Sequence, residues 1–63
     1  MKVEETIPVA LAGERLDRIV SLIADISRSE ARGLVAAGGA SVDSVVAVNG
    51  KARLAEGQLV VVD

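Results

Sequence analysis

Apolar residues repeat with the spacing of a helix between positions 14 and 24. Four of them stand at i, i+3, i+4 and i+7, within an arc of about 100° on a helical surface; these are Leu16, Ile19, Val20 and Ile23. Gly13 and Glu14 open this segment, and Glu14 and Asp17 suit the positive N-terminal end of a helix. We therefore predict a helix over residues 14–24, with Asp25 as its exit.

A capping signal predicts a second helix over residues 28–37. In Ser27-Arg28-Ser29-Glu30 the Ser27 hydroxyl can accept from the backbone N–H of Glu30, while the Glu30 side chain reaches back to Ser27. The inward stripe that follows consists of Ala31, Leu34 and Val35. Gly38-Gly39 should end the helix with one glycine in the left-handed conformation. The short connection to the first helix predicts a compact helical pair.

After residue 40 the spacing of the apolar residues changes from that of a helix to that of short strands. Ala40 and Val42 are followed by β-branched runs at 45–48 and 59–62. Turn signals separate these runs, at Asp43-Ser44, Asn49-Gly50 and Gly57. Residues 3–8, closed by a proline, are predicted as a weaker strand at a sheet edge. The pattern predicts a single α+β domain over residues 1–63, with two helices packed on a small antiparallel sheet.

Composition narrows the classes of function. The chain has 63 residues, of which 51% are hydrophobic and none is aromatic, Cys or His. The missing Cys and His exclude a disulfide framework, a thiol nucleophile, a zinc site and a His general base. With so short a chain as well, we predict no catalytic residue, cofactor or metal. The missing aromatic rings exclude base-stacking platforms. With no apolar run of about 20 residues and no signal-peptide pattern, we expect a cytoplasmic protein that does not enter a membrane.

The arginines of the chain can be interpreted in two ways, as a phosphate-binding surface or as members of surface ion pairs. The net charge is −2, which argues weakly against nucleic acid, yet four of the five arginines lie between positions 15 and 32. They form one pair on each predicted helix, Arg15 with Arg18 and Arg28 with Arg32, and two such pairs could span successive phosphates. Hydroxyls at the start of the second helix, from Ser27 and Ser29, add donors there. The alternative is that the arginines form surface ion pairs, with Glu14, Asp17, Asp25 and Glu30.

The order of these motifs resembles the S4 RNA-binding domain. That family has an Arg-Leu-Asp opening to helix one, a Ser-Arg-Ser start to helix two with a basic residue one turn on, a glycine exit, a Val-Asp-Gly or Val-Asn-Gly turn and a late Gly-Asp or Gly-Gln. The counterparts here are Arg15-Leu16-Asp17, Ser27-Arg28-Ser29, Arg32, Gly38, Val42-Asp43-Ser44 and Gly57-Gln58. The resemblance covers about residues 7–62. The leader over residues 7–17 is most similar to the S4 domain in front of RluA/RluD-type ribosomal large-subunit pseudouridine synthases.

The resemblance implies an S4-like (αL) fold that binds structured, ribosomal RNA beside a C-terminal catalytic domain in a longer parent chain. The fragment would have no activity of its own, and Asp17 would be structural, capping the helix or pairing with an arginine. The implied RNA-binding residues are Arg15, Arg18, Ser27, Arg28, Ser29, Arg32, Lys51 and Arg53.

The sequence departs from the family pattern at three points, and the first two favour a different function. Gly39 stands where a basic residue is usual, and the net charge is less positive than is typical of the family. Ser44 replaces the usual glycine of the first hairpin turn, so that turn is not expected to be of the tightest type. The alternative function is a protein-interaction or intramolecular docking domain with little RNA affinity. The Asn49-Gly50-Lys51 turn could itself contact phosphate, although a plain hairpin turn is the simpler interpretation.

Overall fold

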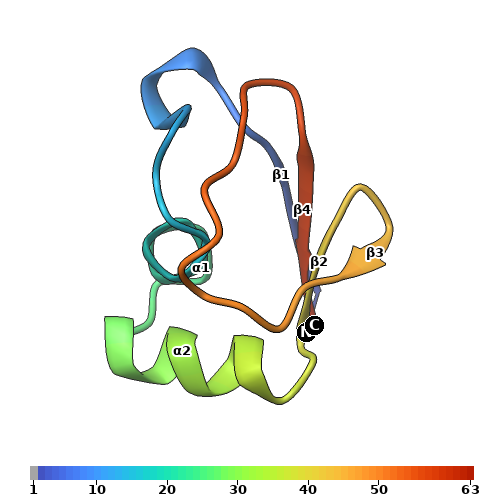
Figure 1. The fold of residues 1–63 in the computed structure, drawn as a ribbon. Coiled ribbons are helices and arrows are strands. Elements are labelled where there is room, and N and C mark those ends of the chain that lie inside the picture. The colour runs from blue at the N-terminus through green and yellow to red at the C-terminus, as the bar shows by residue number, and fades with distance from the viewer. Residues whose placement is uncertain (1) are drawn as a thin grey trace.

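The computed structural model describes residues 2–63 as two helices packed on a four-stranded sheet. The elements are strand β1 (Val3–Thr6), the 3-10 turn η1 (Val9–Leu11), helices α1 (Leu16–Ala24) and α2 (Arg28–Ala36), and strands β2 (Ala40–Val42), β3 (Val45–Val46) and β4 (Leu59–Val62). The sheet is antiparallel with the order β1-β4-β2-β3, and both helices lie on the same side of it (Figure 1). The predicted α+β architecture is confirmed.

The last strand of the chain, β4, lies in the middle of the sheet. Its residues pair with β1 on one side, where Val3 opposes Val62, and with β2 on the other, where Ala40 opposes Val62. Val60 and Val62 are buried while Leu59 and Val61 are partly exposed, which is the alternation of a strand with one face on the core. The weak N-terminal strand is confirmed as an edge strand, since β1 pairs on one side only.

The strand predicted over residues 45–48 is shorter than expected. Only Val45 and Val46 pair with β2, and Ala47 N donates to Ala40 O (3.0 Å) at the end of the ladder. Beyond this point the neighbouring chain is the glycine exit of α2, so residue 48 has no strand to pair with. The Val48 side chain is exposed.

The turn between β2 and β3 is of the tightest type, contrary to our expectation. Val42 pairs with Val45, so the loop has only two residues, and both have positive φ, at 49° for Asp43 and 70° for Ser44. This is the signature of a type I′ turn, in which Asp is tolerated without glycine. Asp43 also joins the turn to β4, because its Oδ1 accepts from Leu59 N (2.9 Å) and its N donates to Leu59 O (2.8 Å).

Helix α1 begins at Leu16, two residues later than predicted. Arg15 is in extended backbone and forms a β-bridge with Arg53, while Gly13 N donates to Leu54 O (2.7 Å) and Leu54 N to Glu14 O (3.1 Å). These bonds to a distant segment hold residues 13–15 out of the helix. The predicted exit is confirmed, since Asp25 adopts the left-handed conformation (φ 56°).

The signals at both ends of α2 are confirmed. Ser27 Oγ accepts from Glu30 N (3.0 Å) and Ser27 N donates to Glu30 Oε1 (3.2 Å), which is the capping box. The helix ends at Ala36, and Gly38 is left-handed (φ 84°). Gly39 N then donates to Leu34 O (2.9 Å), so the exit is a Schellman motif.

The core is aliphatic and contains one buried charge. Its buried apolar side chains come from both helices, β2, β4, the segment after β1 and the loop before β4, and the larger ones are Ile7, Leu16, Ile19, Val20, Val35, Leu54 and Val60. Asp17 is the charged residue buried beside them, at 0% exposure. Among the described residues, no helix is long and apolar enough to cross a bilayer.

Candidate nucleic-acid interface

The buried carboxylate of Asp17, in the first turn of α1, binds two arginines, one just before α1 and one at the start of α2. Its Oδ2 accepts from Nη2 of Arg15 (2.8 Å), and its Oδ1 accepts from Nη2 of Arg28 (3.3 Å), eleven residues further along the chain. The same Oδ1 accepts from the backbone N of Arg18 (2.7 Å). The Arg15 and Arg28 side chains remain 34% and 44% exposed. One carboxylate therefore holds two partly exposed guanidinium groups, although Nε of Arg15 is buried and has no hydrogen-bond partner among the described residues.

Asp17 is held in its charged form by these contacts. Burial raises the pKa of its carboxyl, but the hydrogen bonds from Arg15 and from Arg18 N, with the charges of Arg15 and Arg28, outweigh burial and bring the pKa below the ordinary 3.8. A buried carboxylate with this many donors stays ionised near neutral pH. The interpretation of Asp17 as a residue that pairs with an arginine is confirmed.

Gly50 makes room for this arrangement. Its carbonyl accepts from Asp17 N (3.0 Å), and a Cβ placed on it would lie 3.2 Å from Cβ of Asp17. Leu16 N donates in the same way to Ala52 O (2.8 Å). The first N–H groups of α1 are thus satisfied by the 50–52 segment, and α1 offers no free anion site at its start.

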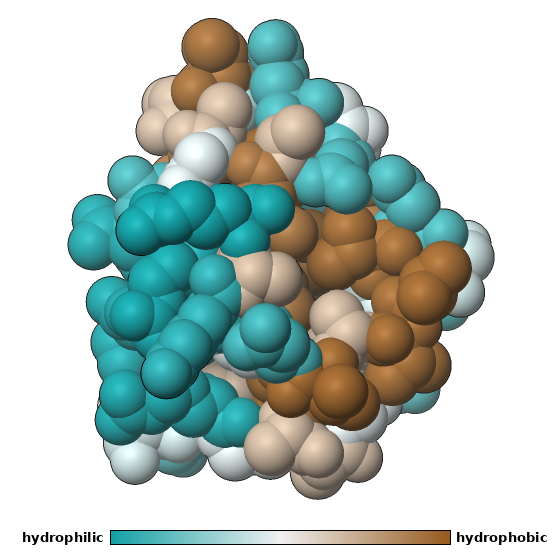
Figure 2. All heavy atoms as spheres, in the orientation of Figure 1, coloured by the Kyte–Doolittle hydropathy of each residue, from teal (hydrophilic) through white to brown (hydrophobic). Residues whose placement is uncertain are grey.

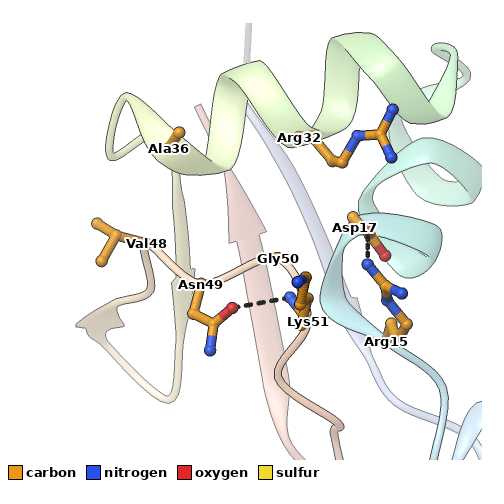
Figure 3. Close-up of a pocket in the computed structure, with 8 residues that line it drawn as sticks. All are labelled: Arg15, Asp17, Arg32, Ala36, Val48, Asn49, Gly50 and Lys51. Atoms are coloured by element: carbon orange, nitrogen blue, oxygen red, sulfur yellow. Dashed lines mark hydrogen bonds and ion pairs between the residues drawn. The ribbon is translucent and has the colours of Figure 1, made fainter.

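A shallow cleft of about 220 Å³ lies between α2 and the turn at residues 49–51. Its lining consists of Arg15, Asp17, Arg32, Ala36, Val48, Asn49, Gly50 and Lys51. Figure 3 shows two unlike ends, with Arg32 and Arg15 beside Asp17 at one end and Ala36 and Val48 at the other. Among residues 2–63, neither Arg32 nor Lys51 forms an ion pair, so their charges are uncompensated by near neighbours.

The cleft collects only part of the predicted site. Arg15, Arg32 and Lys51 line it, and Arg28 joins it through Asp17. The other predicted residues have separate contacts or positions: Arg18 pairs with Glu14 (3.3 Å), Arg53 donates to Gly13 O (2.8 Å), Ser27 caps α2 and Ser29 is exposed. The ion-pair alternative holds for Arg15, Arg18 and Arg28.

The turn at residues 49–51 differs from the hairpin turn that the sequence suggests. Ala52 N donates to Asn49 O (3.1 Å) and Lys51 N to Asn49 Oδ1 (3.0 Å), so the turn itself is confirmed. The segment after the turn pairs with residues 13–17 and not with β3. The sequence therefore gave no signal that would place Asn49 and Gly50 beside Asp17, nor Ala36 and Val48 at the opposite end of the cleft.

The molecule also presents an apolar area around β3. Figure 2 shows hydrophilic residues over the helical side and hydrophobic residues on the side where Figure 1 places β3. Val45, Val46 and Val48 are 69%, 60% and 64% exposed. This area meets the apolar end of the cleft at Val48.

Comparison with family models and curated proteins does not identify a relative of this chain. No protein-family model matches the chain, and no curated protein matches it. The assignment of function rests on the sequence motifs and on the geometry of this surface.

Proposed function

We propose that this chain is an RNA-binding module of the S4 type, which recognises structured RNA through its phosphate backbone. The observation that carries the proposal is the buried Asp17, which fixes Arg15 and Arg28 beside Arg32 and Lys51. A surface ion pair needs no buried carboxylate, whereas two guanidinium groups held in fixed positions suit phosphates at fixed spacing. Without aromatic rings, recognition of backbone and shape is the mode open to this surface.

The close contact of Gly50 strengthens the resemblance to the S4 family. The family's Val-Asn-Gly triplet occurs unaltered at Val48-Asn49-Gly50, and this glycine is the one that packs against Asp17. Val42-Asp43-Ser44 is the other candidate for this triplet, with Ser44 in place of the glycine. We further propose that the module belongs to a cytoplasmic ribosomal RNA pseudouridine synthase, beside a C-terminal catalytic domain.

The proposal is tested by the salt dependence of RNA binding. Each neutralised phosphate releases condensed counterions, so affinity for a structured RNA hairpin should fall as salt rises. In Arg32→Ala, the log–log slope should flatten by roughly 0.7–0.9, because one phosphate contact is lost. Arg32 is exposed and forms no ion pair with residues 2–63, so folding should be preserved. Lys2→Ala is the matched control, because Lys2 is an exposed cation outside the cleft.

Equal affinity and equal slope for wild type and Arg32→Ala would remove Arg32 from the site. The same result for Arg15→Ala and Arg28→Ala, with folding intact, would refute binding of RNA by this surface.

One observation favours a second function, a protein-docking domain. Three exposed valines, at positions 45, 46 and 48, form an apolar area, and the net charge is −2. If docking is the function, RNA should bind weakly and without sensitivity to Arg32, while Val46→Ser should abolish association with the partner domain.

A further inference from the structure

We propose that the cleft between α2 and the 49–51 turn holds a single unpaired nucleotide of the bound RNA, with its phosphate at the cationic end and its base at the apolar end. This inference rests on the proposed RNA-binding function and goes beyond it, since backbone recognition alone requires no base in the cleft. Contacts with phosphate would give no role to Ala36, Val48 and Asn49. The inference assigns these three residues to the base.

The cationic end of the cleft suits one phosphate group. Arg32 and Lys51 form no ion pair among the described residues, and Arg15 is held in place by Asp17 at 2.8 Å. In Figure 3 the Arg15 and Arg32 side chains lie at the same end of the cleft, above and below Asp17. One carboxylate among three cations leaves an excess of two positive charges, although the whole chain has a net charge of −2. An anion is therefore attracted to this end in particular.

The apolar end of the cleft suits the face of a base. Ala36 and Val48 contribute only aliphatic carbon there, and Val48 is 64% exposed, so its methyl groups gain by being covered. The Asn49 Oδ1 is occupied by Lys51 N (3.0 Å), which leaves its NH₂ group as a donor for an acceptor on the base edge. At about 220 Å³, the cleft lies below the range of roughly 300–1,000 Å³ typical of drug-sized ligands. A nucleotide is itself about drug-sized, so the cleft can take one phosphate and one face of a base and leaves the rest of the nucleotide outside.

The nucleotide must be unpaired to enter. In a duplex the base faces are covered by their stacked neighbours, whereas loops and bulges present bases that can be splayed out. The inference therefore predicts that RNA with a bulged nucleotide binds more tightly than RNA whose bulge lacks only the base.

The experiment compares two hairpin RNAs that differ by one base. One has a single-nucleotide bulge, and the other has an abasic residue at the same bulge, so the number of phosphates is matched. We expect the 63-residue protein to bind the intact bulge about three- to tenfold more tightly, the gain from covering one or two carbon groups. Val48→Ser should reduce this ratio to about one, because it removes apolar contact without changing the charge.

A matched valine provides the control. Val9 is 73% exposed and lies outside the cleft, so Val9→Ser should leave the ratio at its wild-type value. Retention of the ratio in Val48→Ser would overturn the assignment of the base to the apolar end.

The result also separates this inference from the proposed function. If both RNAs bind equally, and Arg32→Ala weakens both, the nucleotide site is wrong and the backbone-binding function stands. If neither RNA binds at low salt, both proposals fail. Tighter binding of a phosphoserine peptide than of either RNA, with amide shifts at residues 48–51, would assign the cleft to a protein ligand and overturn the nucleotide site.

Discussion

Helices α1 and α2 begin in contrasting ways. The start of α2 is capped within four residues, by Ser27 and Glu30. The start of α1 has no side-chain cap at Arg15, and its first backbone N–H groups donate instead to Ala52 O and Gly50 O, more than thirty residues away. The local cap stabilises one helix, whereas the long-range contact also joins two parts of the fold and creates the site. This contact holds the 49–51 turn beside the start of α1, and the cleft lies between that turn and α2.

The largest loss of stability is expected from Asp17→Ala. The substitution removes three hydrogen bonds and leaves the Arg15 and Arg28 charges without their buried partner. Because both arginines are partly exposed, the cost should fall at the lower end for a broken buried pair, about 3 kcal/mol. A 63-residue domain is expected to have a free energy of unfolding of roughly 3–9 kcal/mol. Urea denaturation measures the loss, and an unchanged midpoint would contradict the role of Asp17.

A smaller loss is expected from Gly50→Ala. The new Cβ would lie 3.2 Å from Cβ of Asp17, so the turn and the start of α1 must move apart, at a cost of about 1–3 kcal/mol. Gly33→Ala is the matched control, because an added Cβ in the exposed middle of α2 meets open space. That change should stabilise the protein by about 0.5–1 kcal/mol. The two melting temperatures should therefore move in opposite directions, and a parallel shift would exclude a steric role for Gly50.

Ser27→Ala should cost about 0.5–2 kcal/mol, the usual effect of losing an N-cap. The loss should remain local to α2, because the Ser27 hydroxyl accepts from Glu30 N and from no residue of α1. Hydrogen exchange measures this directly. Amides in the first turn of α2 should lose protection while Asp17 N keeps its own. Equal loss at both helix starts would show that the two caps are not independent.

The contrast between the helix starts also explains what the sequence could predict. The capping box, Gly38 and the apolar stripes act over a few residues, so the sequence alone identified α2, its ends and the α+β class. The late start of α1 and the Gly50–Asp17 contact depend on a pairing of residues 13–17 with 50–54, for which no local signal exists. Arg15, Arg32 and Lys51 were predicted for their charge, while Ala36 and Val48 have no recognisable chemistry until the fold joins them.

The smallest effect is expected from acid. The pKa of Asp17 is lower in the folded state than its ordinary value of 3.8, so the folded state binds fewer protons than the unfolded state. Asp17 therefore contributes stability that is complete above about pH 4 and is lost as the pH falls through the folded pKa. In Asp17→Asn, the free energy of unfolding should depend less on pH below 4. An identical acid profile for the two proteins would contradict the lowered pKa.

RNA affinity of Asp17→Asn provides the most direct test of the arginine surface. Removing one negative charge should strengthen RNA binding if only the net charge matters. If Asp17 positions Arg15 and Arg28, binding should weaken by about tenfold despite the more favourable charge, because the guanidinium groups lose their fixed geometry. Glu14→Gln makes the same change in charge at an exposed acid that pairs with Arg18, and should leave affinity equal or slightly higher. With the folded fraction measured for each protein, weaker binding in Asp17→Asn alone is the expected result, and tighter binding in both variants would contradict it.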